Sequence, residues 1–307
     1  MSARHLALVG PTASGKTGFA VELARQLGNL ELLSADAYSV YRDLDIGTAK
    51  PTAAERDGVS WHLLDLVDAD VEFSVAAYRE AAEEAVASVE RRSRRVLFVG
   101  GTGLYLRTVI DALQPPGQYP AVRASLEAIA AEPGGTVALH RRLAGLDPLG
   151  SSRMEPSNTR RIVRALEVTI GSGRPFSSFG PGLGTYGPSR FVQIGLRPSR
   201  AALEGRIVAR LDRQLDGGFV EEVAGLLNRP GGMSRTARQA LGYRELAAYL
   251  DGSCSLDEAR REIVRRTRSF ARRQEAWFAR DPRITWLDPD ADDVLGAMLR
   301  LCSQVVT

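Results

Sequence analysis

The sequence predicts an α/β fold in which a parallel sheet is flanked by helices. Short apolar runs alternate with helical patterns along the N-terminal part of the chain, as in strands joined by crossover helices. Three of these runs are followed by loops that contain glycine, serine or aspartate, at residues 10–17, 34–36 and 100–102. Functional groups of such folds lie at the carboxyl ends of the strands, so we expect these loops to share one site.

The expected elements follow in chain order. Strands are predicted at 6–9, 30–33 and 96–99. One helix is predicted between the glycine-rich loop after the first strand and Gln26, and another at 76–89. Pro and Gly then separate shorter helical stretches at 121–131 and 159–169, before a loop at 172–190. A strand returns at 191–196, and helical patterns follow from Ser199, with a further strand at 284–287. We therefore predict a core of residues 1–112 and 191–307 and a small helical insertion domain at 113–190.

The composition is that of an ordinary globular protein, with 44% hydrophobic residues, 25% charged residues and a net charge of +3. No apolar run approaches the roughly 18 residues of a membrane span, and no secretory signal is evident, so we expect a cytoplasmic protein. The oligomeric state cannot be read from the sequence, and a monomer needs no extra assumption. Cys254 and Cys302 fit neither a disulfide framework nor a metal site. Lysine occurs only at Lys16 and Lys50, and both positions fall within the motifs described below.

The loop after the first strand matches the phosphate-binding pattern G-x-x-x-x-G-K-[ST]. Its residues are Gly10, Pro11, Thr12, Ala13, Ser14, Gly15, Lys16 and Thr17. The glycines let backbone N–H groups turn toward phosphate oxygens, and the N-terminus of the following helix favours an anion. Lys16 supplies a compact positive charge, and the Thr17 hydroxyl can bind Mg²⁺. The fold is therefore predicted to be P-loop NTPase-like, with a site for a nucleotide or another di- or triphosphate.

The motif alone does not identify the reaction. A P-loop nucleotide or metabolite kinase would usually carry an aspartate at the end of an apolar strand to hold Mg²⁺. The strand at 96–99 ends instead in Gly100, Gly101 and Thr102. Asp36, at the end of another strand, could be a metal ligand or a general base. A kinase and a non-enzymatic RNA-binding switch both remain open at this point.

Several further motifs carry a resemblance to a known family. They are S-A-D-x-x-x-x-Y-R-x-x-D-I-G-T-A-K-P at 34–51, G-G-T-G-L-Y at 100–105, R-A-L-E-V at 164–168, A-L-G-Y-R-E at 240–245, and the segment 267–278 with R-R-Q and W-F. Together with the P-loop, this ordered set is similar to the tRNA dimethylallyltransferases (isopentenyl-diphosphate:tRNA transferases). Ala37, Ser39, Trp61 and Arg272 depart from the family's usual residues, and the first two bear on base-context selectivity.

The resemblance implies a prenyl transfer from dimethylallyl diphosphate to the exocyclic N6 of an adenosine beside the tRNA anticodon. It implies that Asp36 is the catalytic base, that the P-loop with Mg²⁺ holds the departing diphosphate, and that Thr102 positions the reacting groups. Arg206, Arg210 and Arg213 are candidates for a second cationic contact to the diphosphate. Arg210 is the favoured one of the three. Lys50 is expected to contact phosphate or backbone.

The same resemblance implies contacts with a tRNA anticodon stem-loop. The target adenine must be flipped out of its stack to reach Asp36. The implied tRNA-binding residues are Asp36, Ala37, Tyr38 and Ser39 in one loop, and Arg123, Arg160, Arg161, Ile162, Val163 and Arg164 in the insertion. Independently, helical spacing aligns Arg261, Arg265, Arg268 and Arg272 on one face near the C-terminus, which suits a phosphate backbone.

Overall fold

The computed structural model describes residues 5–179 and 183–303. The chain divides into two compact units, which are considered separately. The first comprises Met1–Asp111 and Tyr186–Thr307, and the second comprises Ala112–Thr185. Residues 186–190 therefore group with the sheet, although the sequence analysis assigned them to the insertion.

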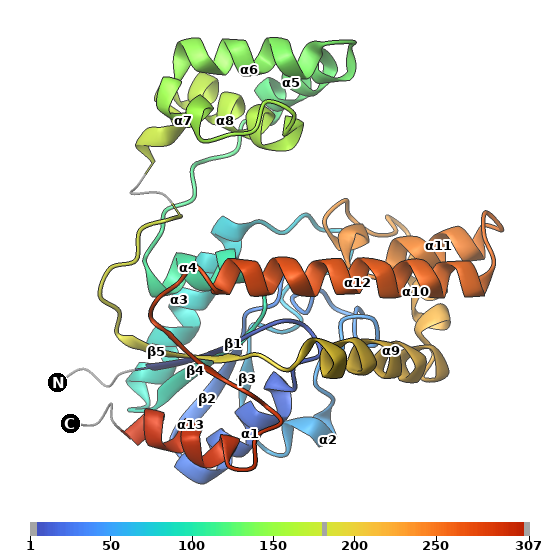
Figure 1. The fold of residues 1–307 in the computed structure, drawn as a ribbon. Coiled ribbons are helices and arrows are strands. Elements are labelled where there is room, and N and C mark those ends of the chain that lie inside the picture. The colour runs from blue at the N-terminus through green and yellow to red at the C-terminus, as the bar shows by residue number, and fades with distance from the viewer. Residues whose placement is uncertain (1–4, 180–182, 304–307) are drawn as a thin grey trace. The chain divides into compact units, whose positions relative to one another are not determined.

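The first unit is built on a six-stranded sheet with the order β3-β2-β4-β1-β5-β6, in which every neighbouring pair is parallel (Figure 1). The strands are β1 (His5–Val9), β2 (Leu30–Ser34), β3 (Trp61–His62), β4 (Arg95–Gly100), β5 (Phe191–Leu196) and β6 (Ile284–Leu287). The predicted parallel sheet is confirmed. Only β3 was not predicted, because two residues carry no periodic signal.

Helices cover both faces of the sheet (Figure 1). On one face Leu6 and Leu8 pack with α1 (Lys16–Leu27) and α13 (Val294–Ser303). On the other, Ala7 and Val9 belong to the core beneath α3 (Val75–Arg91) and α4 (Gly103–Ile110). Strands buried on both sides have no polar face, so β1 is a continuous apolar run from Leu6 to Val9 without alternation. Each fully buried leucine contributes roughly 1.5–3 kcal/mol to the free energy of unfolding.

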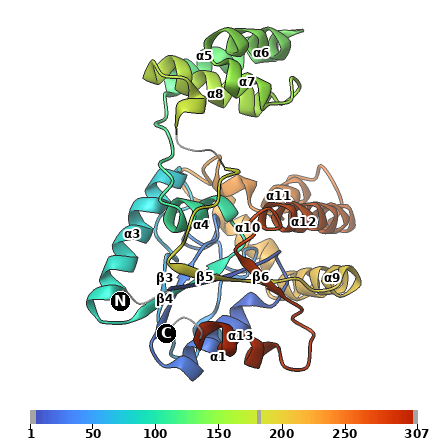
Figure 2. The ribbon, with the colours of Figure 1, turned by 60° about the vertical axis from the view of Figure 1, so that its left-hand side comes forward.

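Four further helices pack together beside the sheet (Figure 2). They are α9 (Arg200–Asp216), α10 (Phe219–Leu227), α11 (Tyr243–Leu250) and α12 (Leu256–Phe278), and the short α2 (Ala53–Arg56) precedes β3. Ser255 begins α12 with a capping box, in which its hydroxyl accepts from the Glu258 N–H and Glu258 accepts from the Ser255 N–H. Arg260 on α12 pairs with Asp212 on α9 at 2.7 Å. This ion pair joins α9 and α12, which lie side by side.

The second unit is a helical bundle with its own apolar core. Its helices are α5 (Pro120–Ala131), α6 (Gly135–Leu146), α7 (Pro148–Ser152) and α8 (Thr159–Ser172), followed by a 3₁₀ turn at Phe176–Ser178. Buried Asp147 accepts hydrogen bonds from Gly150 N–H and from the N–H and hydroxyl of Ser177. Burial raises the pKa of Asp147, but the hydrogen bonds from Ser177 and Gly150 outweigh this and hold the pKa below its ordinary value.

Within the described part of the chain, no helix is both long and apolar enough to cross a membrane. Cys254 and Cys302 are free thiols, and Cys302, on α13, is buried in the core that this helix shares with α1 and the sheet.

A glycine in β5 provides a test of the packing between β5 and β6. A Cβ atom at Gly195 would lie 2.6 Å from the Trp286 ring and 2.7 Å from Ile284. We expect Gly195→Ala to lower the free energy of unfolding by about 1–3 kcal/mol through overpacking, measured by urea denaturation. Gly225→Ala on α10, where nothing lies within 4 Å of the added Cβ, is the control and should be neutral or stabilising. An unchanged stability for Gly195→Ala would contradict this account.

Candidate active site

A cavity of about 510 Å³ lies at the carboxyl edge of the sheet. The P-loop forms one wall, and the segments after β2 and β4, the helix α9 and Gln274 of α12 form the others. All three loops that the sequence analysis singled out meet there, although the last contributes Gly100 and Gly101 and not Thr102. The cationic side chains around this cavity are Lys16, Lys50, Arg206, Arg210 and Arg213, against the two carboxylates Asp36 and Glu55.

The P-loop has the backbone shape of an anion nest. Gly10, Ala13 and Gly15 all have positive φ, at 145°, 63° and 87°. Gly10 must also lack a side chain, because a Cβ there would approach the Leu196 carbonyl oxygen to 2.6 Å. No acidic residue occupies the first turn of α1, so its N-terminal dipole is not neutralised. Of the predicted motif, residues 12–17 line the cavity, whereas Gly10 and Pro11 shape the entry to the loop.

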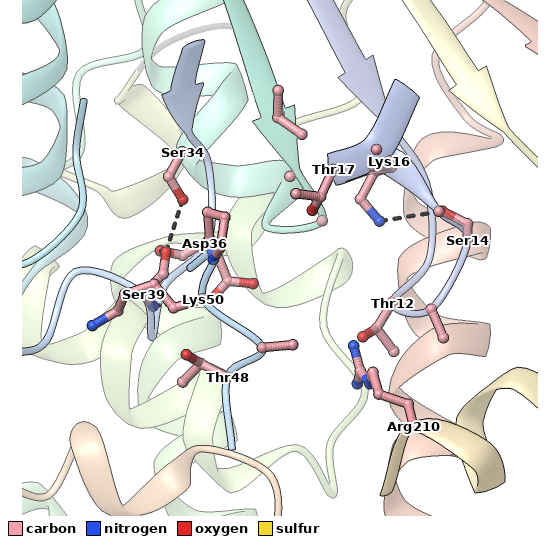
Figure 3. Close-up of a pocket in the computed structure, with 18 of the residues that line it drawn as sticks. Thr12, Ser14, Lys16, Thr17, Ser34, Asp36, Ser39, Thr48, Lys50 and Arg210 are labelled. Carbon is pink, nitrogen blue, oxygen red and sulfur yellow. Dashed lines mark hydrogen bonds between the residues drawn. The ribbon is translucent and has the colours of Figure 1, made fainter. Parts of the chain in front are cut away.

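Lys16 lies inside the nest. Its Nζ donates to the Pro11 carbonyl at 2.6 Å and to the Ser14 hydroxyl at 3.3 Å (Figure 3). Burial, followed by the charge of Arg210, lowers the pKa of Lys16 to about 7, with Asp36 opposing both effects. A bound anion would favour the charged ammonium, so ligand binding and protonation of this side chain are coupled.

Asp36 faces the P-loop across the cavity (Figure 3). Its Oδ1 accepts hydrogen bonds from the backbone N–H groups of Tyr38 at 2.8 Å and Ser39 at 3.3 Å. Its Oδ2 accepts no hydrogen bond from any residue that the structure describes. The carboxylate is thus oriented through one oxygen, while the other is available to a ligand.

The three arginines of α9 that line the cavity differ in their surroundings. Arg206 forms an ion pair with Asp290. Arg210 forms no ion pair within residues 5–179 and 183–303 and lines the cavity opposite Asp36 (Figure 3). Burial lowers the pKa of Arg210, Asp36 opposes this, and Arg213 adds to it. Among the three, Arg210 is the one whose charge acts on both Lys16 and Asp36.

Thr102 supports the loop that carries Asp36. Its hydroxyl oxygen accepts the Ala37 N–H at 3.1 Å, and its own N–H donates to the Ala35 carbonyl at 3.0 Å. Ser39 is buried, and its hydroxyl lies 2.7 Å from that of Ser34. Thr102 and Ser39 therefore fix the backbone on both sides of Asp36, a role that the sequence analysis did not assign to them.

The segment after this loop is held by residues that the sequence analysis missed. Glu222 accepts the three successive N–H groups of Asp45, Ile46 and Gly47 at 2.7–3.1 Å, and also accepts from the Tyr243 hydroxyl. Gly47 is required here because a Cβ would collide with Phe219 and Tyr243. The motif D-I-G-T-A-K-P and the run L-G-Y-R-E are thus packed against each other, a contact that sequence order alone does not reveal.

Lys50 belongs to the same structural cluster. Its buried Nζ donates to the Tyr41 carbonyl at 2.7 Å, to Asp65 at 2.5 Å and to Asp45. Of the two expectations for Lys50, the structure shows the backbone contact.

Gln274 was not predicted as a site residue, although it lies in one of the motifs. Its Oε1 accepts the Thr12 N–H at 2.8 Å, and its Nε2 donates to the Gly101 carbonyl at 3.0 Å. The side chain therefore connects α12 with two of the loops that form the cavity. Its place on the apolar stripe of a helix concealed this role, since buried positions on such a stripe usually only pack.

The RNA-contact candidates of the second unit fall into three groups. Arg160 and Arg161 are exposed on α8. Arg123 and Arg164 are half-buried and pair with Glu167, at 3.6 and 2.8 Å. The side chains of Ile162 and Val163 are buried in the bundle core, so an RNA contact of these two residues would have to be made by their backbone.

The C-terminal helix α12 has the expected division into two faces. Arg261, Arg265 and Arg272 are exposed, and Arg268 is partly covered by an ion pair with Glu204 at 3.7 Å. The opposite face is buried at Ala259, Ile263, Thr267, Ala271, Gln274 and Phe278.

Comparisons with known proteins agree with this site. The family model described as IPP transferase matches residues 39–281. A tRNA dimethylallyltransferase of Streptomyces coelicolor is 47% identical over 290 residues, covering 94% of this chain and 92% of the relative. One from a Nocardioides species is 46% identical over 285 residues, covering 93% and 91%. The crystal structure of a tRNA isopentenylpyrophosphate transferase from Bacillus halodurans has a TM-score of 0.72 and 35% identity, covering 99% of this chain and 98% of that one. The chain therefore belongs to the IPP transferase family, together with these tRNA dimethylallyltransferases.

Proposed function

We propose that this protein transfers a dimethylallyl group from dimethylallyl diphosphate to the exocyclic N6 of the adenosine 3′-adjacent to the anticodon of tRNA, and releases diphosphate. The observation that carries the proposal is the shared cavity: a phosphate nest lies on one side and the Asp36 carboxylate, with Oδ2 unoccupied by any described donor, lies on the other. N-alkylation of an amine requires stabilisation of the leaving group and a proton acceptor, and the nest and Asp36 offer these two functions.

The chemical step follows from this placement. The lone pair of an exocyclic amine is delocalised into the adenine ring, so N6 needs a base as it attacks. Asp36 Oδ2 takes the N6 proton, the new N–C bond forms at the allylic carbon, and the C–O bond to the diphosphate breaks. The electron pair of that bond leaves with the diphosphate oxygen. The Tyr38 and Ser39 N–H groups hold the carboxylate in place throughout.

The charge that develops on the diphosphate is stabilised by the nest. The backbone N–H groups of residues 13 and 15–17 and the N-terminus of α1 would surround the departing oxygens, and Lys16 and Arg210 supply positive charge. Arg210 is favoured over Arg206 because Arg206 already pairs with Asp290.

The residues present fit Mg²⁺ bound together with the diphosphate. Thr17 lines the cavity beside the nest and offers a neutral oxygen ligand. Among the described residues no group of three or more His, Cys, Asp or Glu side chains is arranged to hold a metal ion. Mg²⁺ often takes most of its ligands from substrate phosphates and water, so Thr17 with a diphosphate is a sufficient set. The ion would supply additional charge neutralisation to the leaving group.

The nucleic-acid partner would be met by two basic surfaces. The exposed arginines of α12 and the exposed Arg160 and Arg161 of the helical unit are suited to a phosphate backbone. The loop at 36–39 would receive the flipped adenine, and the second unit would hold the anticodon stem-loop. We propose that the protein acts as a monomer, since one chain supplies every group used above. We also propose that it acts in the cytoplasm.

The direct test is incubation with dimethylallyl diphosphate and tRNA that lacks the modification, followed by mass analysis of the nucleosides. We expect a gain of one five-carbon unit on a single adenosine beside the anticodon. A parallel incubation with ATP examines the kinase alternative. Transfer of a phosphate from ATP without prenylation would refute the proposal.

Replacement of the proposed base should separate binding from turnover. Asn at position 36 keeps an oxygen for the Tyr38 and Ser39 N–H groups but cannot accept the N6 proton. We expect Asp36→Asn to lower kcat by roughly two to four powers of ten while diphosphate and tRNA still bind. Asp43→Asn, which removes an exposed ion pair with Arg229, is the matched control. A kcat within threefold of the wild type for Asp36→Asn would exclude the base role.

Lys16 makes diphosphate binding depend on pH. In the free protein the pKa of Lys16 is about 7, and the bound anion raises it, so above pH 7 binding must take up a proton. The affinity for dimethylallyl diphosphate without tRNA should therefore fall between pH 7 and pH 9, by up to about tenfold per unit. Titration calorimetry in two buffers of different ionisation enthalpy should detect proton uptake at pH 8. Lys16→Met should bind weakly and lose this dependence, and a wild-type affinity that is flat above pH 7 would contradict the assignment.

A further inference from the structure

The P-loop holds a conformation that its sequence alone does not favour. Ala13, which is not glycine, has φ 63°, a region that costs a side-chain-bearing residue about 1 kcal/mol or more. Such a conformation persists when surrounding contacts fix it. On its inner side the loop is fixed by Lys16, whose Nζ donates to the Pro11 carbonyl at 2.6 Å.

A second contact fixes the loop from outside. Pro11 has no N–H, so the Thr12 N–H is the first donor of the loop proper, and it points at Gln274 Oε1 at 2.8 Å rather than at the phosphate site. The same amide donates through Nε2 to the Gly101 carbonyl at 3.0 Å. Gln274 is 5% exposed, so both hydrogen bonds are shielded from water.

The neighbouring chain is shaped around this amide. A Cβ at Gly101 would collide with Gln274 Nε2, so a glycine is needed for the approach. One side chain of α12 thus bridges the loop after β1 and the loop after β4, 262 and 173 residues away in sequence. Both polar atoms of the Gln274 side chain form hydrogen bonds with the backbone. Neither atom is therefore directed at a substrate.

From these contacts we propose that Gln274 is a positioning residue for the donor site: it holds the P-loop in its phosphate-binding shape by tying Thr12 to Gly101. The proposal rests on the proposed function for the identity of the ligand, a diphosphate, but not for the geometry. Gln274 acts through the loop and not on the reacting atoms. Loss of the bridge releases the Thr12 N–H and lets Ala13 relax out of the left-handed region, so the nest is no longer preformed.

The first experiment replaces the amide by an apolar side chain of similar length. We expect Gln274→Met to weaken binding of inorganic diphosphate by roughly 10- to 100-fold in titration calorimetry, because the preformed nest is lost. Gln26→Met is the matched control, since Gln26 is exposed on α1 and its amide donates to the Glu22 carboxylate. In turnover assays Gln274→Met should raise KM for dimethylallyl diphosphate more than it lowers kcat. A lowered Tm with diphosphate affinity within twofold of the wild type would show a merely structural role and overturn the proposal.

The second experiment tests the bridge itself with a double-mutant cycle. Gly101→Ala alone should displace Gln274 and weaken diphosphate binding to a similar extent as Gln274→Ala. In the Gln274→Ala background the collision with the amide is removed and only the Gly10 carbonyl oxygen remains close, at 3.3 Å, so the added Gly101→Ala change should cost less than threefold. Strictly additive losses would mean that Gly101 and Gln274 act separately, and would contradict the proposal.

The readouts separate this proposal from the proposed function. Diphosphate binding is measured without tRNA or prenyl transfer, so the Gln274 variants are informative even if the wild-type protein prenylates no tRNA. Conversely, wild-type prenylation with unchanged diphosphate affinity in Gln274→Met would leave the function standing and remove the positioning role.

Discussion

The constraint on which this structure depends is the parallel alignment of its strands. Because all six strands run in one direction, the carboxyl ends of β1, β2 and β4 lie at the same edge. β4 lies between the other two and pairs with both, so the P-loop after β1 and Asp36 after β2 are separated by one strand. The P-loop nest, which binds an anion, and the Asp36 carboxylate, which is itself negatively charged, are thereby held on opposite sides of one cavity.

Keeping these two groups apart makes the electrostatics workable. A diphosphate and a carboxylate repel each other, and Lys16 and Arg210, whose charges act on Asp36 and on each other, compensate for this repulsion. Without a ligand the same cations repel one another, and burial adds to the cost of their charge. The protein therefore maintains a site that is electrostatically unfavourable when empty and becomes balanced when an anion enters.

Much of this arrangement is readable from sequence, because it depends on short local patterns. The P-loop, five of the six strands and the loop that carries Asp36 follow from apolar runs and glycine spacing. What the sequence could not reveal depends on pairs distant in the chain. Glu222 beneath the turn at 45–47 and Gln274 behind Thr12 are ordinary helix residues until the fold brings them to their partners. The burial of the Ile162 and Val163 side chains also could not be read from the motif, because a motif lists neighbours in sequence, whereas a helix sends adjacent residues to different faces.

The near absence of lysine gives the cavity an unusual chemical selectivity. The chain has two lysine side chains, and both border the site. Lys50 is buried, and its Nζ is tied by hydrogen bonds to the Tyr41 carbonyl and to two carboxylates, whereas the pKa of Lys16 is lowered to about 7, so that a substantial fraction of its amine is neutral near pH 7. A neutral amine is a nucleophile and an ammonium is not. An acylating reagent small enough to enter the cavity would therefore find one reactive side-chain amine, and a bound anion, by restoring its proton, would shield it.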